Sequence, residues 1–381
     1  MKKPDIRKQR LLISIEKKLG KIKQHQRLIM VIDKPEDIFY YTGFWGEGIL
    51  IIDQDLNTKL IVPRLEYYRA QTTSRGCEVI PSERGKRLTD SISKMIKSKT
   101  MICYGGNDYM IATTLTRHIE KQNFHIAEDI VQKNRQIKDK QEIEKIKIAS
   151  KIIDRLFTIA QSEIKINRSE EEIQSTLVYE ALRMGARFPN YQFTSNPLIV
   201  ASGPNGSFPH AETSSRKIKN GELVVLDITL SYDHYVSDAT RTFGVGNVPK
   251  KIRDVYCIVK DAQESAINRI KTTNNFAEID SECRRIIKKA GFGEFFIHST
   301  GHGVGLEVHE LPWIRPNVDS TIEENMTITI EPGIYVEKKY GIRIEDSLWI
   351  TSRKSSNKKS ETIDHFDPFN FHNFDKGLIV I

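Results

Sequence analysis

The chain has 381 residues, of which 39% are hydrophobic and 28% are charged, as expected for a soluble globular protein of two domains. It holds no apolar run near the roughly 18 residues that are needed to cross a bilayer. Its four scattered cysteines form no close pair with metal or redox spacing, which favours a reducing, cytoplasmic setting. The net charge of +8 suggests a nucleic-acid role, but the lysines alternate with acidic residues, as in DKQEIEKIKIASK; we therefore expect neither nucleic acid nor membrane as a partner.

The first half of the chain shows short apolar runs between polar turns and helices. An amphipathic helix is predicted near the N-terminus, because Leu12, Ile15, Leu19 and Ile22 recur at helical spacing. Its apolar core is too short for a secretory signal. Four apolar runs predict strands over residues 28–32, 49–52, 59–62 and 101–104. This pattern is typical of a small α/β domain, to which we assign residues 1–135.

The second half begins after a charged segment, residues 134–141 (NRQIKDKQ), which we interpret as a linker. Large apolar residues mark one face of the helix that follows, namely Ile143, Ile146, Ile153 and Phe157. A second helix begins at the capping-box pattern of Ser169 and Glu172 and ends near Gly185. Two further helices are predicted over residues 251–271 and 277–290. The rest reads as strands and hairpins, so we assign residues 136–381 to a second domain and the chain to the α+β class.

Residues 221–246 (GELVVLDITLSYDHYVSDATRTFGVG) are predicted to form a β-hairpin with carboxylates on one face. A turn at residues 232–233 would place Asp227 opposite Asp238, with their Cβ atoms roughly 5 Å apart. Like charges that face each other destabilise a sheet unless a cation lies between them. A salt bridge from Arg241 is one source of that cation, and a metal ion is the other.

The same pattern recurs in EPGIYVEKKYGIRIED, where a turn around Lys338 would place Glu331 opposite Glu345. Four carboxylates on two hairpins, together with a histidine, form a ligand set for two divalent ions ~3.5–4 Å apart. Oxygen ligands with a single imidazole favour Mn, Co or Fe, with Zn also possible. The sequence therefore predicts a site for two divalent metal ions.

HSTGHGVGLEVHELP, residues 298–312, contains three histidines and suggests a phosphate loop, a metal site or a core strand. A dinucleotide-binding loop is rejected, because Leu306 stands where the third glycine would fall. A core strand fits the alternation of Val304, Leu306 and Val308, but it does not fit the glycines at 301, 303 and 305. Glycines lower strand propensity and admit a close approach of backbone or ligand. These residues therefore exclude the phosphate loop and count against the core strand.

Five motifs in the second half, in order and at matching spacing, resemble the pita-bread metallopeptidases: prolidases (Xaa-Pro dipeptidases), aminopeptidase P, methionine aminopeptidase and creatinase. They are PHAE around His210, LDITLSYDHYVSDATRTF, HSTGHGVGLEVHE, ITIEPGIYV and GIRIED. In the first half PEDIFYYTGF resembles the creatinase/prolidase N-terminal domain. Among these proteins the chain is most similar to archaeal prolidases. The resemblance implies a small creatinase-type α/β domain followed by a pita-bread catalytic domain.

The resemblance also implies a role for each site residue. Asp227 would chelate one metal ion, Asp238 and Glu345 would bridge both ions, and His302 and Glu331 would complete the other metal site.

Outside the metal ligands, the resemblance implies that His309 contacts the substrate carbonyl, that His210 lines the substrate pocket and that Arg343 fixes the carboxylates. His298 would lie just behind the ligands or take part directly. Glu331 would also carry the proton from the attacking water to the leaving nitrogen. No role is assigned to His25, His118, His125, His365 and His372.

The function implied is hydrolysis of the Xaa-Pro bond in dipeptides or short peptides by a cytoplasmic, homodimeric metalloenzyme. Two departures bear on the substrate: Trp313 stands where prolidases often carry an arginine, with Arg315 two residues on, and Thr229 replaces a usual glycine. Aminopeptidase P activity on longer peptides therefore stays open. A metal-free binding module on the same fold is the alternative from another class, and methionine aminopeptidase is disfavoured by the creatinase-type first domain. The aromatic C-terminal tail matches nothing and is expected to dock on the body or on a second subunit.

Overall fold

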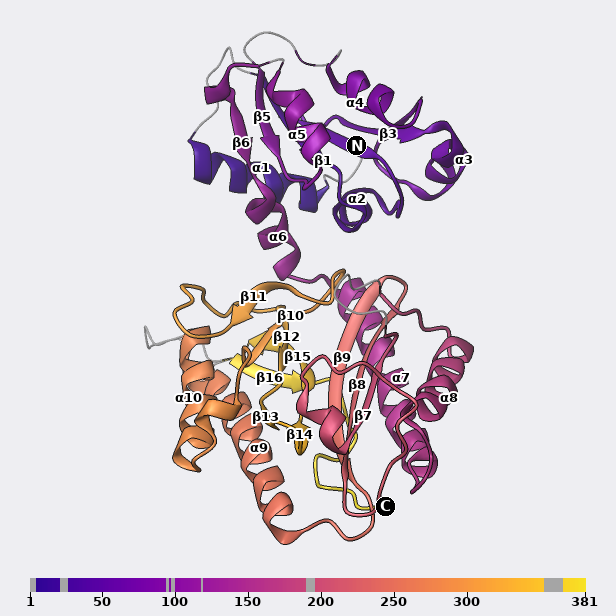
Figure 1. Cartoon of the computed structure of the whole chain (residues 1–381). Coiled ribbons are helices and arrows are strands. Elements are labelled where there is room, and N and C mark those ends of the chain that lie inside the picture. The colour runs from indigo at the N-terminus through magenta and orange to yellow at the C-terminus, as the bar shows by residue number, and fades with distance from the viewer. Residues whose placement is uncertain are drawn as a thin grey trace. The chain divides into compact units, whose positions relative to one another are not determined.

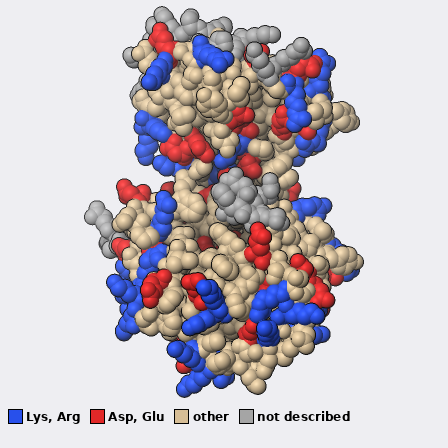
Figure 2. Space-filling model, in the orientation of Figure 1, with Lys and Arg blue, Asp and Glu red and all other residues tan. Residues whose placement is uncertain are grey.

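The computed structural model describes residues 5–20, 27–93, 96, 100–117, 119–189, 196–352 and 366–381. The chain divides into two compact units, Met1–Arg135 and Gln136–Ile381 (Figure 1). Of the residues named above, Ile22, His25, His118 and His365 lie outside the described ranges. No helix in these ranges is long and apolar enough to cross a membrane. On the face drawn in Figure 2, Lys and Arg are mixed with Asp and Glu, so the excess positive charge is dispersed there.

The first unit is built on one six-stranded sheet of order β4-β3-β2-β1-β5-β6, in which β1, β5 and β6 run parallel. The strands are β1 (Arg27–Ile32), β2 (Ile49–Asp53), β3 (Thr58–Pro63), β4 (Glu78–Ser82), β5 (Thr100–Tyr104) and β6 (Phe124–Ile126). The helices are α1 (Ile6–Leu19), α2 (Pro35–Thr42), α3 (Arg64–Thr73), α4 (Lys86–Ser93), α5 (Tyr109–Thr116) and α6 (Glu128–Gln136). All four predicted strands are confirmed. β4 and β6 lie partly exposed at the two edges of the sheet, and neither has the continuous apolar run that identified the others.

The predicted N-terminal helix is confirmed as α1, which begins after Asp5, whose side chain accepts hydrogen bonds from the first turn. Its core-facing residues are Leu11 and Ile15, whereas Leu12 is only half-buried.

The interpretation of residues 134–141 as a linker is wrong for most of that segment. α6 continues through Gln136 and α7 begins at Lys140, so only three residues separate the helices. Two of the charged side chains here are paired and buried: Arg135 Nη1 lies 2.7 Å from Asp37, and Lys138 Nζ lies 2.7 Å from Glu310. Internal ion pairs, which the sequence pattern does not show, allow these charges to leave water.

The second unit has strands at its centre and two pairs of helices outside them (Figure 1). Its helices are α7 (Lys140–Glu163), α8 (Glu170–Arg183), α9 (Lys250–Arg269) and α10 (Phe276–Lys289). Its strands are β7 (Ile199–Ser202), β8 (Leu223–Tyr232), β9 (Tyr235–Gly244), β10 (Gly301–Gly303), β11 (Glu310–Ile314), β12 (Thr327–Ile330), β13 (Gly333–Val336), β14 (Tyr340–Arg343), β15 (Asp346–Ser352) and β16 (Phe366–Asn370). The four predicted helices are confirmed, including the capping box of Ser169 and Glu172.

Two hydrophobic cores hold this unit together. In the first, α7 and α8 pack against the sheet β7-β8-β9 through Ile153, Phe157, Leu177 and Leu226. In the second, α9 and α10 pack against strands of the sheet β11-β10-β12-β15-β16 and the ribbon β13-β14. The predicted apolar face of α7 is therefore the face that builds a core. The polar site lies between these strand groups.

The predicted register of the β8–β9 hairpin is wrong by two residues. The loop is Asp233-His234, with φ of +47° and +71°, and Tyr232 pairs with Tyr235. Positive φ at both loop residues is the conformation that joins twisted strands by a two-residue turn. Asp227 therefore lies opposite Thr240 instead of Asp238. A shift by two residues keeps every side chain on its face, so the two aspartates still share one face as diagonal neighbours.

The predicted register of the second hairpin is confirmed. Gly333 pairs with Arg343 in the β13–β14 ribbon, and Ile330 pairs with Asp346 where β12 meets β15. Glu331 and Glu345 lie between these pairs in sequence, and their backbones bond to Thr300 and Thr240 instead of to each other. Lys338, at the tip, has φ of +59°.

The C-terminal tail docks on the body of its own chain. β16 pairs with β15, Phe374 packs against Phe157 at 5.2 Å between ring centroids, and the backbone of Ile381 exchanges hydrogen bonds with Gly244 and Gly246. Of the body and a second subunit, the two docking sites expected for the tail, the structure shows docking on the body.

Candidate metal centre

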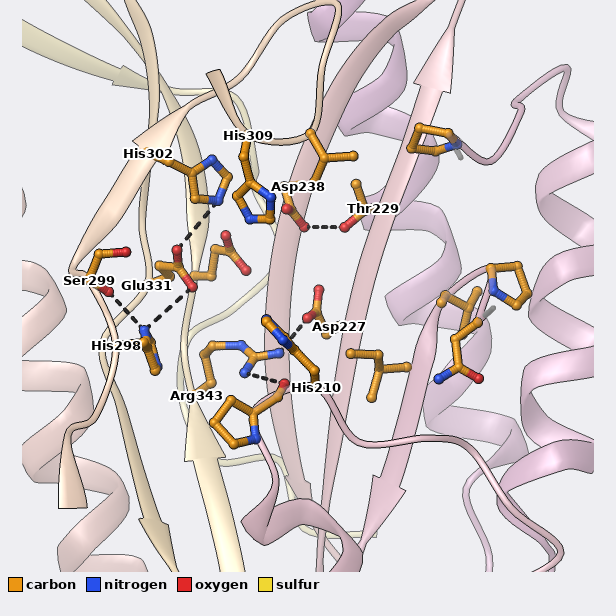
Figure 3. Close-up of a pocket in the computed structure, with 18 of the residues that line it drawn as sticks. His210, Asp227, Thr229, Asp238, His298, Ser299, His302, His309, Glu331 and Arg343 are labelled. Carbon is orange, nitrogen blue, oxygen red and sulfur yellow. Dashed lines mark hydrogen bonds and ion pairs between the residues drawn. The ribbon is translucent and has the colours of Figure 1, made fainter. Parts of the chain in front are cut away.

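The residues singled out from the sequence line one pocket (Figure 3). They come from separate segments of the second unit: His210 from the loop after β7, Asp227 from β8, Asp238 from β9, His298 from the segment before β10, His302 from β10, His309 from the loop before β11, Glu331 from the residue after β12, Arg343 from the end of β14, and Glu345 from the link between β14 and β15. Segments that are far apart in sequence thus bring four carboxylates and four histidines together.

The core of the site is a buried cluster of Asp238, His302 and Glu345. One ligand atom from each lies within 4.8 Å of the others, and the three residues are no more than 5% exposed. Burial, with repulsion from Glu345 and Asp227, raises the pKa of Asp238 well above its ordinary range. Burial and the charge of Asp227 raise the pKa of Glu345 to about 8. Without a bound metal ion, these raised pKa values therefore disfavour ionisation of all the acids at once.

Two carboxylate oxygens of the site have no hydrogen-bond donor within the described residues: Asp227 Oδ1 and Glu345 Oε1, both buried. A buried polar atom without a partner is costly, and such atoms in native proteins call for an explanation. Divalent cations prefer hard oxygen ligands of this kind. The donor set therefore fits a divalent metal.

His302 presents one ring nitrogen to the site. Its Nδ1 lies 3.0 Å from the carbonyl oxygen of Gly303, which only accepts, so Nδ1 carries the proton. Burial lowers the pKa of His302 well below its ordinary value, and the ring is neutral. Nε2 keeps its lone pair and lies 3.4 Å from Glu331 Oε1 (Figure 3). Metal-binding histidines are usually oriented by such a hydrogen bond to a backbone carbonyl.

Arg343 is the buried cation among these carboxylates. Its Nη2 donates to Asp227, Nε donates to Thr240 Oγ1 at 3.1 Å, and Nη1 donates to the carbonyl of Pro209. Burial acts to lower the pKa of Arg343, but Tyr335 and the carboxylates prevail and raise it well above its ordinary value. Four carboxylates against one guanidinium leave an excess of negative charge when all are ionised.

Tyr335 is a site residue that the sequence analysis missed. Arg343 only donates, so its Nη1–H points to the Tyr335 hydroxyl at 2.7 Å, and the hydroxyl proton is left for His298 Nε2 at 2.9 Å. His298 Nδ1 then donates to the carbonyl of Ser299 at 2.8 Å. Burial, followed by the charge of Arg343, lowers the pKa of His298 to about 3. His298 is therefore a neutral ring fixed in one tautomer.

Two threonines on the hairpin also orient carboxylates. Thr229 Oγ1 donates to Asp238 Oδ1 at 2.8 Å, and Thr240 Oγ1 donates to Glu345 Oε2 at 2.7 Å. Both roles escaped the sequence analysis. Strand alternation is the signal that could have found them, since Thr229 and Thr240 share a face with Asp227 and Asp238.

His309 lies beside the cluster. Its ring centroid is 4.2 Å from that of His302, and its ring lies nearly parallel to that of Trp313, with 6.0 Å between the centroids and 20° between the planes. Burial, followed by the charge of His210, lowers the pKa of His309 to about 4, and burial also lowers the pKa of His210. The pocket wall beyond them is apolar, with Pro189, Pro197, Leu198, Pro209 and Val308.

The chain is similar in sequence to known protein families. Residues 144–352 match metallopeptidase family M24, and residues 15–137 match the creatinase/prolidase N-terminal domain. The Xaa-Pro dipeptidase of Pyrococcus furiosus is 37% identical over 322 residues, which cover 84% of this chain and 90% of that protein.

Solved structures are similar over nearly the whole chain. The prolidase of Pyrococcus horikoshii OT3 has a TM-score of 0.83 at 30% identity and covers 98% of this chain and 100% of its own. The X-Pro aminopeptidase of Thermotoga maritima has a TM-score of 0.79 at 28% identity, with 98% and 99% covered.

Proposed function

The chain belongs to metallopeptidase family M24, with a creatinase/prolidase N-terminal domain ahead of a pita-bread catalytic domain, and from this premise we propose that it is a metal-dependent exopeptidase that hydrolyses the Xaa-Pro bond of dipeptides and short peptides. The observation that carries the proposal is the buried cluster of acids and one imidazole, in which two carboxylate oxygens have no donor. We place the domain boundary between residues 135 and 136.

In this proposal five side chains hold two divalent ions, of which Mn, Co and Fe suit the oxygen-rich set best and Zn is also possible. Asp227, Asp238, His302, Glu331 and Glu345 would hold these ions. When bound, such a pair makes water available as a nucleophile near neutral pH and polarises the peptide carbonyl.

The other side chains orient the substrate and move its protons. Glu331, whose side chain is 15% exposed to the pocket, takes the proton of the attacking water and delivers it to the leaving proline nitrogen. His309 donates a hydrogen bond to the carbonyl oxygen as negative charge develops there. His210 lines the pocket, and His298 orients Tyr335 and Arg343. Proline lacks an amide proton and has a fixed φ, so its ring needs a shaped, apolar pocket.

Trp313 bears on whether dipeptides are preferred over longer peptides. A buried arginine at this place would hold a C-terminal carboxylate by charge-assisted hydrogen bonds and penalise peptides that extend past proline. Trp313 lines the pocket, and the Arg315 guanidinium lies 5.7 Å over its ring. We therefore propose a relaxed length preference, which keeps activity of the aminopeptidase P kind as the second candidate.

The length preference is tested by kcat/KM for Ala-Pro and for Ala-Pro-Ala in the wild type and in Trp313→Arg. We expect comparable values for the two peptides in the wild type and a shift toward Ala-Pro in the variant, while Arg315→Ala serves as the matched control. A wild-type preference of a hundredfold or more for Ala-Pro that the tryptophan substitution leaves unchanged would refute the idea. Loss of that preference in Arg315→Ala would assign the carboxylate clamp to Arg315.

The main proposal is tested with chain stripped of metal by a chelator and reloaded with Mn²⁺, Co²⁺, Fe²⁺ or Zn²⁺. We expect hydrolysis of Ala-Pro only after reloading, about two ions per chain by emission spectroscopy, and slow or no hydrolysis of Ala-Ala. A stripped chain that hydrolyses Ala-Pro as fast as the reloaded one would rule out the metal mechanism. A reloaded chain that binds peptides but cleaves none would point to a binding module.

We also propose that the enzyme is cytoplasmic and homodimeric. The four cysteines are free thiols, which suits a reducing compartment. The dimer rests on the family resemblance, and light scattering after gel filtration tests it: a mass near twice 43.8 kDa is expected.

A further inference from the structure

The C-terminal strap, which we define as residues 366–381 (yellow in Figure 1), pairs with β15, which begins directly after Glu345, and its last residues bond to Gly244 of β9, the strand that carries Asp238. Neighbouring residues in an extended chain point to opposite sides. Ser237, which precedes Asp238, and Asp346, which follows Glu345, therefore point away from the pocket. Both of these side chains contact the strap.

Asp346 collects donors from the strap and from α9. Its Oδ2 accepts from Lys376 Nζ at 2.6 Å, from Asn370 Nδ2 at 3.0 Å and from Gln263 Nε2 at 2.9 Å, while Oδ1 accepts from Arg241 at 2.7 Å. Asp346 is fully buried. Burial alone would raise its pKa, but Arg241 and Lys376 hold the pKa of this carboxyl well below its ordinary range.

Arg241 connects the strap to the backbone of Glu345. Its Nη1 donates to the Glu345 carbonyl at 2.7 Å and to the Thr240 carbonyl at 3.0 Å. Its Nη2 and Nε donate to the strap carbonyls of Phe374 and Asp375, at 3.0 and 3.1 Å. With the bond to Asp346, the five N–H groups of a buried guanidinium are all used.

His372 makes the corresponding connection to Asp238. Its Nδ1 lies 3.1 Å from Asp154 on α7, and its Nε2 lies 3.3 Å from Ser237 Oγ. Ser347 of β15 makes a further connection between the strap and Asp238. Its Oγ donates to the Asp238 carbonyl at 2.8 Å, and its own carbonyl accepts from the strap amide of Phe371 at 3.2 Å.

We propose that the C-terminal strap is a positioning element of the metal centre, with Lys376 and His372 as its positioning residues. Lys376 fixes Asp346 and thereby the Glu345 segment, and His372 fixes Ser237 and thereby the Asp238 segment. Two neighbouring carboxylates repel each other until cations bind, so contacts on the side of the strands away from the pocket are needed to keep them in place. The inference rests on the proposed function, because it assigns the strap to the metal ligands of that function.

The test measures Mn²⁺ affinity of the metal-stripped chain by calorimetric titration, next to kcat and KM for Ala-Pro. Lys376→Met keeps the alkyl stem and removes the ammonium, and His372→Phe keeps a ring and removes both nitrogens. We expect each to weaken Mn²⁺ binding and lower kcat about ten- to a hundredfold, as is typical for residues that orient ligands, while KM is unchanged. Lys376→Arg should restore most of the affinity.

The matched control is Tyr256→Phe. It removes a 2.9 Å hydrogen bond to the carbonyl of Lys376 itself, without touching Asp346 or Ser237. It should lower the unfolding temperature and leave Mn²⁺ affinity unchanged. Circular dichroism verifies that each variant is folded, and if one variant does not fold, the other decides.

Wild-type Mn²⁺ affinity in folded Lys376→Met and His372→Phe would overturn the inference and reduce the strap to a packing element. That result would leave the proposed function intact. A wild-type chain that binds no Mn²⁺ would overturn both.

Discussion

At the scale of single residues, the site depends on how buried charge is compensated. Asp227, Asp238, Glu331 and Glu345 share one buried guanidinium, Arg343. Burial, followed by repulsion from neighbouring carboxylates, raises the pKa values of Asp238, Glu331 and Glu345. The hydroxyls of Thr229 and Thr240 donate to two of these carboxylates and orient them. Metal ions would replace protons as the missing positive charge. Single substitutions here should therefore separate ligands from residues that act on the substrate.

Replacing Asp238 by Asn removes one charge from the centre of the cluster without changing its size. We expect loss of Mn²⁺ binding and a fall in Ala-Pro turnover of more than about a hundredfold, beyond what residues that only orient ligands usually cost. Metal content and kcat are the measurements. Asp233→Asn is the control, because Asp233 lies at the exposed tip of the same hairpin and pairs with Lys145. Near-normal activity with bound metal in Asp238→Asn would contradict the site assignment.

His309→Ala should separate catalysis from metal binding. His309 lies beside His302 but outside the cluster of Asp238, His302 and Glu345. We expect unchanged Mn²⁺ stoichiometry and a kcat lower by roughly ten- to a thousandfold, as for loss of one donor to a developing oxyanion. If the metal content fell and kcat per bound metal did not, His309 would be a ligand.

At the scale of elements, buried polar contacts fix the loops that carry the site. Glu170, the first residue of α8, is fully buried and accepts hydrogen bonds from Ser202, Asn205 and Ser214 at 2.6–3.1 Å. These residues flank the loop that carries His210. One helix terminus thus orders a segment of the pocket.

We predict that Glu170→Ala lowers the free energy of unfolding by about 1–3 kcal/mol for each buried donor left without an acceptor. Urea denaturation followed by circular dichroism measures this, with Glu171→Ala, on the exposed side of the same helix turn, as the control. Equal unfolding midpoints for the two variants would show that the Glu170 contacts contribute nothing to stability.

Sequence reasoning succeeded for elements whose pattern is local. Ile143 and Phe157 mark the buried face of α7, and Ser169 marks the start of α8. It failed at the β8–β9 turn, since alternation fixes the face of a strand but not its partner, and the register depended on the backbone conformation of Asp233 and His234.

At the scale of the whole molecule, all five proposed ligands belong to the second unit, Gln136–Ile381. Metal binding should therefore stabilise that unit. The strap should link metal binding more closely to the stability of this unit, because its residues pack on the unit and also contact Asp346 and Ser237, the neighbours of two proposed ligands.

We predict that Mn²⁺ at a hundred times its dissociation constant stabilises the stripped chain by about 2.7 kcal/mol for each ion bound. Scanning calorimetry should show a higher unfolding temperature for the transition of the second unit, and EDTA should reverse the shift. Asp238→Asn should show no shift. An equal shift in that variant would indicate binding at another site.

The sequence by itself determined the α+β class, the N-terminal helix, the four helices of the second unit, four of the strands of the first sheet and the second hairpin register. These follow from periodicity, capping and turn position, which are properties of neighbouring residues, whereas the set of residues that meet in the pocket was implied by the family resemblance of five motifs. Only the tertiary structure decided that Asp227 faces Thr240, that Tyr335 fixes the tautomer of His298, and that His372 lies against Ser237 behind Asp238. Such contacts join residues far apart in the chain, and they exist only once two packed cores bring their strands together.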